Sequence, residues 1–146
     1  MRRLVFDTMV QVVLHRGRVP EKWSGIWRDI KEGRACLILQ ETLVAELSYR
    51  LVPLGGEGKA RQRVLWLKSL RRTEILHTND EMAMRAGFLH SRFHGLYGVG
   101  LVDCFALAAA ESARAELITA DVGIRDTARD LRIRVNWLPL EEVDVE

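Results

Sequence analysis

Four carboxylate side chains of this chain are candidates for one shared site. Asp103 lies in the segment Leu101–Ala110, in which every other residue is apolar. Asp7 and Asp121 each follow directly on a short strand-like segment, and Glu46 lies beside the apolar face of a predicted helix. An ionised carboxylate in apolar surroundings is costly unless a cation or hydrogen-bond donors meet it. The simplest group that would satisfy all four acids is a shared metal cation.

The residue types of this set indicate which metal and which chemistry to expect. Packed carboxylates repel, and each raises the pKa of its neighbours. A divalent cation removes that penalty, and a set of carboxylates without Cys or His favours Mg²⁺ or Mn²⁺ over zinc. Mg²⁺ keeps several waters and takes substrate phosphates as further ligands. The predicted chemistry is therefore hydrolysis of a phosphodiester bond by a water that the metal positions and activates.

The elements that must position these acids alternate between strand and helix patterns. Strands are predicted at 3–6, 35–39, 73–77, 117–119 and 132–137. Helices are predicted at 8–15, 20–33, 40–50, 59–70, 81–96 and 102–114, with a short helix or turn at 121–131. A flexible loop is expected around Gly95, Gly98 and Gly100. This alternation indicates an α/β fold with a parallel sheet that is covered on both faces.

Such a fold can bring distant acids together. In an open parallel sheet, sites form at the carboxyl ends of the strands, near the switch in strand order. Asp7 closes the first strand, Asp121 follows the fourth, and Asp103 opens the helix that leads into the fourth. Glu46 lies two turns into the helix after the second strand. We therefore expect all four to converge at one edge of the sheet.

The composition of the chain, which has 146 residues, is 48% hydrophobic and 29% charged, as in a globular protein. We expect one domain at 1–140 and an acidic tail at 141–146. The net charge of +2 argues against a strongly basic nucleic-acid binder. No apolar run approaches the roughly 20 residues that span a bilayer, and the first strand begins at Arg3, so we expect no membrane segment, no signal peptide and a cytoplasmic protein. Cys36 and Cys104 lack CxxC spacing and are expected to be buried and reduced.

Four segments, taken in order, resemble the acidic motifs of PIN domains, and most nearly those of the VapC-type toxins of prokaryotic toxin–antitoxin pairs. The segments are FDT at 6–8, LILQETLVAEL at 37–47, GLVDCFALAAA at 100–110 and LITAD at 117–121. Residues 80–95 also resemble the helix that precedes the third acid. The resemblance covers essentially the whole chain, and four motifs at PIN-like spacing are more specific than any one of them.

The resemblance implies a three-layer α/β/α fold with a mostly parallel five-stranded sheet, in which the first and fourth strands are neighbours. The acids that match the metal-binding positions of the family are Asp7, Glu46, Asp103 and Asp121. Thr8 and Thr119 match polar residues that support the site by hydrogen bonding. The implied protein is a Mg²⁺-dependent (or Mn²⁺-dependent) endoribonuclease acting on single-stranded or structured RNA, a homodimer, and the target of a separately encoded antitoxin that blocks its site.

One departure from the family pattern concerns the fourth acid. Family members often follow it closely with an acid and an aromatic residue, whereas here no aromatic intervenes and the next acid, Asp126, lies five residues on. Asp126 is therefore a further candidate that assists or replaces Asp121. Arg85 and Arg92 are weaker candidates for contacts with RNA phosphates, because Arg suits bidentate phosphate recognition. The alternative is that they are arginines scattered over the surface without a role in binding.

Each acid also has a purely structural interpretation. Asp7, Asp103 and Asp121 can cap the helices that follow them, and Glu46 alone can be a solvated helix residue. Glu41 is the alternative to Glu46 as the acid of the second motif. It stands at the start of the helix, where an acid suits the helix dipole, whereas Glu46 matches the family motif and neighbours the apolar face.

Other activities fit the sequence less well. His90 and His94 are four residues apart on a predicted helix but lack a third zinc ligand at proper spacing. An aspartyl phosphatase would want a second Asp where Met9 stands, a receiver domain would need an acidic pair and a late Lys, and a dinucleotide-binding module would need a glycine-rich turn. Two rivals stay open: a PIN nuclease that processes RNA without an antitoxin, and a PIN-like binding module without catalysis.

Overall fold

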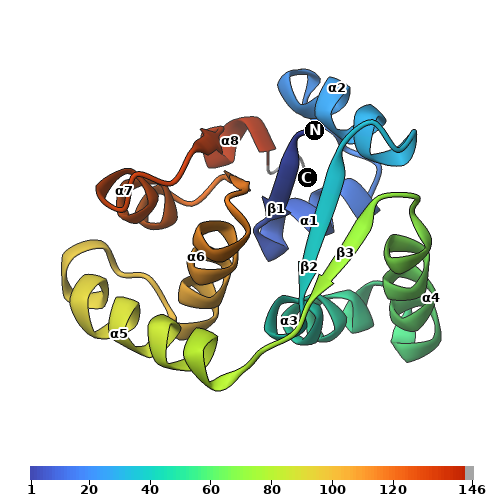
Figure 1. Ribbon diagram of the computed structural model, residues 1–146. Coiled ribbons are helices and arrows are strands. Elements are labelled where there is room, and N and C mark those ends of the chain that lie inside the picture. Colours follow the sequence, from blue (N-terminus) through green and yellow to red (C-terminus); the bar gives the residue numbers. More distant parts are fainter. Residues whose placement is uncertain (144–146) are drawn as a thin grey trace.

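Helices separate the strands along residues 1–143, which are the residues that the computed structural model describes (Figure 1). The strands are β1 (Arg3–Phe6), β2 (Cys36–Gln40), β3 (Thr73–Leu76), β4 (Glu116–Thr119) and β5 (Val135–Trp137). The helices are α1 (Thr8–His15), α2 (Glu21–Lys31), α3 (Glu41–Leu51), α4 (Gly56–Ser69), α5 (Asp80–Tyr97), α6 (Leu101–Ala113), α7 (Val122–Asp130) and α8 (Leu140–Val143). A 3₁₀ turn, η1 (Val52–Leu54), joins α3 to α4.

The strands form one parallel sheet in the order β3-β2-β1-β4-β5. The register pairs Phe6 of β1 with Ile118 of β4. The backbone N–H of Asp7 also donates to the carbonyl oxygen of Ile118 at 2.9 Å, so the hydrogen bonding between β1 and β4 continues for one residue past the end of β1. The expected pairing of the first and fourth strands is confirmed. The residues that follow these strands lie side by side at the switch in strand order, where open α/β sheets form their sites.

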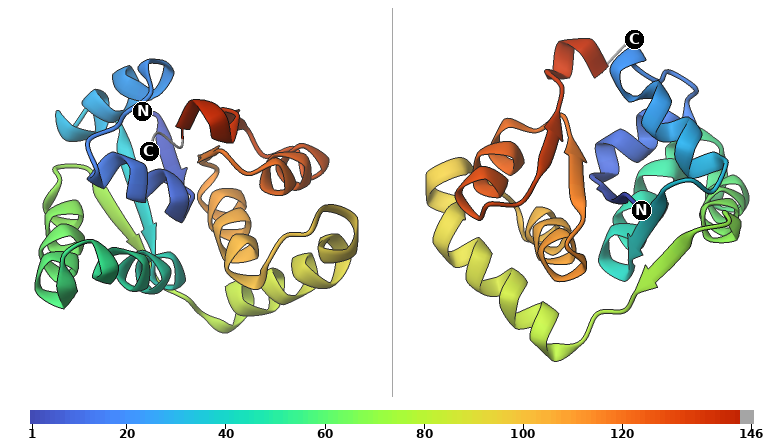
Figure 2. Two further views of the ribbon diagram at one scale, coloured as in Figure 1. Left: turned by 180° about the vertical axis from the view of Figure 1, so that it is seen from behind. Right: turned by 45° about the horizontal axis from the view of Figure 1, so that its top comes forward.

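Side chains along the strands alternate between two cores, as the period of a strand requires. Leu4 and Phe6 belong to a core shared with α1, α2, α3 and α4, and Val5 belongs to the core on the opposite face, with α5, α6 and α7. Seen from behind in Figure 2, α1 crosses in front of β1 and β2. Helices thus cover both faces, and the expected three-layer α/β/α arrangement is confirmed.

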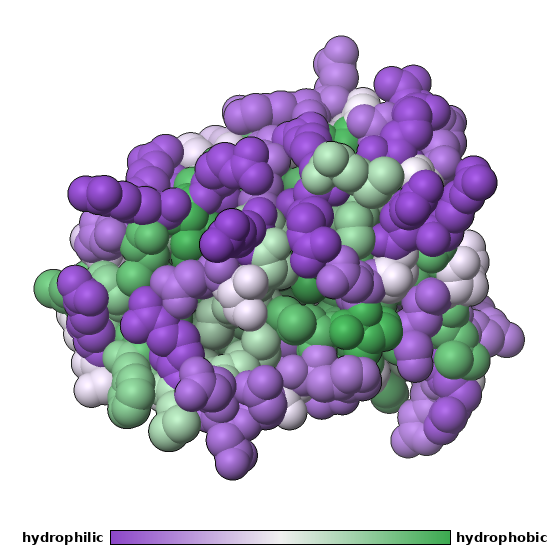
Figure 3. Space-filling model, in the orientation of Figure 1, coloured by the Kyte–Doolittle hydropathy of each residue, from purple (hydrophilic) through white to green (hydrophobic). Residues whose placement is uncertain are grey.

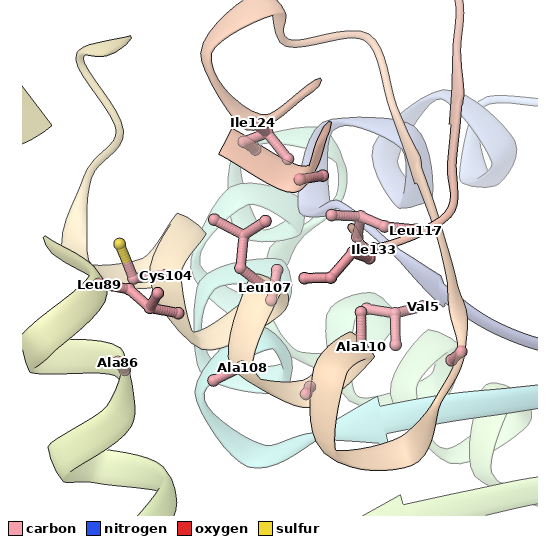
Figure 4. Close-up of a cluster of buried hydrophobic side chains, with 14 of the residues drawn as sticks. Val5, Ala86, Leu89, Cys104, Leu107, Ala108, Ala110, Leu117, Ile124 and Ile133 are labelled. Carbon is pink, nitrogen blue, oxygen red and sulfur yellow. The ribbon is translucent and has the colours of Figure 1, made fainter. Parts of the chain in front are cut away.

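Helix α6 packs between the sheet and α5, and its small side chains let it come close. Its alanines at 106, 108, 109 and 110 are all buried. Figure 4 shows Leu107 of α6 surrounded by apolar side chains, among them Leu117 of β4 and Ile133. Cys36 and Cys104 are buried and unpaired, as expected. This packing fixes the helix whose first turn carries Asp103.

The structure corrects several expected boundaries. Helix α4 begins at Gly56 and not at Lys59. Gly95 lies inside α5, and the turn that was expected to begin there begins at Gly98, whose φ of +72° gives the left-handed end that glycine favours. Residues 141–143 of the expected acidic tail lie in the short helix α8, whose first turn holds acids that suit the helix dipole, and the domain boundary expected at 140 stays a prediction. The rest of that tail, residues 144–146, lies outside the described residues.

Apolar side chains also reach the surface. Figure 3 shows apolar surface in the middle of one face, surrounded by hydrophilic side chains. The exposed large apolar residues of α3, η1 and α4 are Tyr49, Val52, Leu54, Leu65 and Trp66, and those of α5 are Met84, Phe88 and Leu96. Within residues 1–143, no single helix has the length and apolarity to cross a membrane. The helices α5 and α6 meet that test only as a pair, across a bend of 118°.

Candidate functional site

Asp7 joins the end of β1 to the start of α1. It occupies the N-cap position of α1, but its side chain makes no capping hydrogen bond. Its Oδ2 instead accepts a hydrogen bond from the hydroxyl of Thr119 at 3.0 Å. Only 7% of Asp7 is exposed. The pairing of β1 with β4, and not helix capping, therefore sets the direction of this carboxylate.

Thr119, the last residue of β4, connects Asp7 to Asp121. Its buried hydroxyl donates to Asp7 and accepts a hydrogen bond from the backbone N–H of Asp121 at 3.0 Å. Asp121 is the N-cap of α7, and its Oδ1 accepts from the backbone N–H of Ile124 at 2.8 Å. The capping role foreseen for Asp121 is therefore real, and it holds the carboxylate at the carboxyl edge of the sheet.

Asp103 lies in the first turn of α6, where Gly100 is the N-cap. Its Oδ2 accepts a hydrogen bond from the backbone N–H of Gly100 at 2.8 Å. A helix N-terminus favours a negative charge, and this bond fixes the side chain over the start of the helix. Asp103 is half-buried, so one of its oxygens is held by the fold while the residue still reaches the surface.

Glu46 and Glu41 lie on the same helix but in different places. The side chain of Glu46 is 18% exposed and accepts from Nε of Arg50 at 3.4 Å. Glu41 turns away: its Oε1 lies 2.5 Å from Nδ1 of His77, and its Oε2 accepts from the backbone N–H of Thr78. Glu46, and not Glu41, therefore faces the other three acids.

The four acids line one hollow of about 190 Å³ at the carboxyl edge of the sheet. Its lining residues are Asp7, Met9, Glu46, Arg50, Asp103, Ala120 and Asp121. The pKa of Asp7 is raised to about 7, first because burial disfavours its charged form, then because Asp103 repels that charge. The pKa of Asp103 is also raised, first by burial and further by Asp121 and Glu46. The hollow is a site of concentrated negative charge that a cation would stabilise.

The donor set suits Mg²⁺ or Mn²⁺, because it consists of carboxylates with no imidazole or thiolate. Oδ2 of Asp7, Oδ2 of Asp103 and Oδ1 of Asp121 are each held by a protein donor, so the second oxygen of each is available to a cation. Among the described residues, however, no three such side chains are close enough together to hold one ion as placed.

Thr8 and Asp126, the two remaining candidates for residues that support the site, differ in burial. Thr8 is buried, and its Oγ1 has no hydrogen-bond partner among the described residues, so its support of the site stays a prediction. Asp126 accepts from Nε of Arg125 at 3.0 Å and is not part of the lining of the acidic hollow. The structure therefore does not bring Asp126 into the hollow with the other acids.

The two arginine candidates for RNA contacts lie on α5, outside the hollow. Arg85 forms a bidentate ion pair with Glu111, with N–O distances of 2.7 and 2.9 Å. Arg92 is exposed, with its guanidinium 4.9 Å from the ring centroid of Phe93. His90 and His94 stack on one another with ring centroids 4.7 Å apart. The described residues give these histidines no third partner for a metal.

Two residues of the site escaped the sequence analysis. Arg50 lines the hollow, and the signal that could have found it is its spacing: it follows Glu46 by four residues on one helix, where opposite charges meet. Gly123 is the second. A Cβ at this position would lie 2.3 Å from the carbonyl oxygen of Tyr97, so the turn that carries Asp121 requires glycine. That close approach between α7 and α5 is tertiary and has no signal in the local sequence.

Comparisons with solved structures show which folds this arrangement shares. The structure of VapBC2 from Rickettsia felis bound to a promoter DNA fragment matches this chain with a TM-score of 0.70 at 16% identity. The match covers 92% of this chain and 98% of the chain in that structure. DNA-bound VapBC from Salmonella typhimurium has a TM-score of 0.63 at 17% identity, covering 94% and 98%. VapBC-1 from nontypeable Haemophilus influenzae has a TM-score of 0.61 at 19% identity, covering 95% and 98%. At these identities the likeness is one of fold.

A comparison with curated proteins gave no match. The sequence itself matches one family, the PIN domain, over residues 4–130. This range contains all five parts of the site: the ends of β1 and β4, the middle of α3 and the first turns of α6 and α7. The chain is a member of the PIN domain family.

Proposed function

We propose that this protein is a divalent-metal-dependent nuclease that cleaves RNA, and that it is the toxin of a toxin–antitoxin pair. The observation that carries the proposal is the convergence of four acids, from four separate parts of the chain, on one hollow at the carboxyl edge of the sheet. PIN domains are generally nucleases, which supports hydrolysis of a phosphodiester bond.

Each residue of the site has a task in this proposal. Asp7, Asp103 and Asp121 would bind Mg²⁺ or Mn²⁺, with Glu46 as a fourth ligand or as the acceptor of a hydrogen bond from a metal-bound water. The metal would supply an activated water and offset the charge of the phosphate under attack. Thr119 would fix the orientation of Asp7, as outer hydrogen bonds do for metal ligands generally. The backbone N–H groups of Gly100 and Ile124 would do the same for Asp103 and Asp121.

A small antitoxin protein is the proposed partner, because the structures similar to this chain include VapBC complexes and another toxin–antitoxin complex. The surface proposed for it is the groove between α3 and α4, a hollow of about 510 Å³. Tyr49, Val52 and Leu65 contribute exposed apolar surface to this groove. The groove shares α3 with Glu46, so an apolar segment of the partner seated there would lie on the helix that carries one of the four acids.

A second copy of the chain is the proposed partner of α5. Met84, Phe88 and Leu96 are exposed by 51%, 65% and 67% on this helix. Large apolar side chains that gather on one surface mark interaction sites. Most soluble homo-oligomers are two-fold symmetric, so that the same surface of each copy meets the other. Covering these side chains with their equivalents would remove them from water.

The test of the proposed function is cleavage of labelled single-stranded and structured RNA by the purified protein, with Mn²⁺ and with EDTA. We expect cleavage in Mn²⁺, none in EDTA, and loss of cleavage in Asp103→Asn and Glu46→Gln. Glu41→Gln is the matched control, because it changes the same residue type on the same helix outside the hollow. Cleavage that persists in Asp103→Asn would contradict the assigned site.

Co-purification with the product of a neighbouring small gene would then separate the toxin from an RNA-processing nuclease. A protein that co-purifies and suppresses cleavage supports the toxin proposal. Cleavage by a protein that no such product suppresses would favour an RNA-processing nuclease. A folded protein that cleaves no RNA in any metal would favour a binding module.

A further inference from the structure

One cation stands among the four acids of the hollow. Arg50 is the one positively charged residue among those described as lining it. Its Nε lies 3.4 Å from Oε1 of Glu46, and its charge also attracts Asp103. The hollow thus contains an internal cation in addition to any metal that it binds.

The surroundings of Arg50 leave it free to move. Its side chain is 43% exposed, and its hydrogen bond to Glu46 is the one that its guanidinium makes within the described residues. The other contact is with the ring of Tyr49, whose centroid lies 5.8 Å from the guanidinium carbon. A partly exposed ion pair of this kind is weak and contributes about 1 kcal/mol or less. Arg50 can therefore leave Glu46 when a stronger cation arrives.

Arg50 and a divalent cation would neutralise the same carboxylates. A guanidinium near Glu46 and Asp103 reduces the repulsion among the acids, which reduces what a metal gains by entering. A divalent ion in the hollow would in turn repel the guanidinium. Two cations that are attracted to the same carboxylates and repel each other weaken each other's binding. This negative coupling is reciprocal.

We propose that Arg50 is a built-in counter-cation that competes with divalent metal for the acidic hollow, and so raises the metal concentration that the site needs. The inference rests on the proposed metal site and adds its regulation. Arg50 is in this account a positioning residue: it holds Glu46 while metal is absent and releases it when metal binds.

The test measures Mn²⁺ affinity directly, from the electron paramagnetic resonance of free Mn²⁺, and the melting temperature without metal. The variant Arg50→Gln should bind Mn²⁺ more tightly, by about fivefold, the size of one partly exposed ion pair. Without metal, it should melt at a lower temperature than the wild type, because the acids have lost their counter-cation. A residue with a merely structural role would lower both the melting temperature and the affinity.

Two variants serve as controls. Arg50→Lys keeps the charge and should bind Mn²⁺ within about twofold of the wild type. Arg34→Gln removes one arginine from ion pairs with Asp29 and Glu32, ahead of β2 and at the opposite edge of the sheet, and should leave Mn²⁺ affinity unchanged. Arg50→Met keeps the aliphatic stem of the side chain and replaces Arg50→Gln if that variant does not fold.

The outcomes separate this inference from the proposed function. Equal or weaker Mn²⁺ binding by a folded Arg50→Gln, with binding intact in the wild type, would overturn the counter-cation role and leave the metal site standing. Absence of Mn²⁺ binding in the wild type and in every Arg50 variant would overturn the metal site itself, and the inference with it.

Discussion

The hydroxyl of Thr119 donates a hydrogen bond of 3.0 Å to Oδ2 of Asp7, although the two residues are 112 positions apart in the chain. The bond exists because β1 and β4 are neighbours and Phe6 pairs with Ile118. The same hydroxyl accepts from the backbone N–H of Asp121. One buried threonine thus sets the relative positions of two of the four acids.

We expect Thr119→Val to impair the site although the substitution barely changes the volume of the side chain. Valine keeps the volume but leaves the carboxylate of Asp7 and the N–H of Asp121 without their partner. At pH 8, where Asp7 is mostly ionised, loss of a hydrogen bond to a charged group costs about 1.5–3 kcal/mol. Loss of an outer hydrogen bond to a metal ligand costs about 10- to 100-fold in metal affinity or activity. Thermal denaturation and Mn²⁺ titration measure both effects. Thr119→Ser should retain most of the thermal stability and most of the Mn²⁺ affinity. If serine reduced both as much as valine does, packing of the side chain and not its hydroxyl would be the cause.

The stability of the metal-free protein should fall as pH rises from about 5 to about 8. The pKa of Asp7 is raised to about 7 in the folded protein, mainly by burial, so the folded state keeps a proton that the unfolded chain has lost. Stability declines with pH wherever the folded state binds more protons. The stabilising contribution of this proton is complete below about pH 4 and is lost as the pH rises through 7. The free energy of unfolding should fall by on the order of a few kcal/mol over this range. Urea denaturation at a series of pH values measures it.

Asp7→Asn is the control for that pH dependence, because an amide of the same shape cannot ionise. Its stability should change less between pH 5 and pH 8 than that of the wild type. Saturating Mn²⁺ should also flatten the wild-type curve, since metal favours the carboxylate form. If Asp7→Asn showed the same slope as the wild type, the burial of Asp7 would not be the cause of the pH dependence.

Gly123→Ala should destabilise the turn that carries Asp121. A Cβ at Gly123 would lie 2.3 Å from the carbonyl oxygen of Tyr97 and 3.1 Å from Oδ1 of Asp121, so the backbone must shift. Overpacking of this kind costs about 1–3 kcal/mol, and RNA cleavage should fall with it. Gly87→Ala is the matched control: no atom lies within 4 Å of its added Cβ, and alanine in an exposed helix should stabilise by about 1 kcal/mol. Thermal denaturation compares the two.

Phe88→Glu should convert the proposed dimer into a monomer. Phe88 is 65% exposed on α5, and a charge there would have to be buried between two copies. Light scattering measures the mass. Leu65→Glu places the same charge on the α3–α4 groove and should leave the mass unchanged while weakening co-purification with an antitoxin. A wild-type protein that is a monomer at all concentrations would refute the dimer, whatever the variants do.

The sequence alone predicted the elements that carry strong local signals. The apolar spacing of Thr8–His15 and the apolar run at the start of β2 reproduce α1 and β2 nearly to the residue. The breaks expected at Gly56 and Gly95 were wrong, because both glycines lie in helices that are stabilised by packing of their other residues. Local propensity is a weak term that tertiary contacts override.

Asp103 stands out from the sequence alone, because a charge within an otherwise apolar segment is conspicuous without any coordinates. Asp7 and Asp121 follow strands, and together with Glu46 they predict a shared cation, which stays a prediction. The choice of Glu46 over Glu41 rested on the resemblance and on the apolar face that Glu46 neighbours. The structure places Glu46 in the lining of the hollow, whereas Glu41 contacts His77.

The tertiary structure alone decided how the acids are held. The bond from Thr119 to Asp7, the place of Arg50 in the hollow and the need for glycine at 123 all follow from contacts between elements that are distant in the chain. The spacing of residues along a strand or helix specifies which face a side chain is on. The register of β1 with β4 and the packing of α7 on α5 specify what it meets there, and these depend on the whole fold.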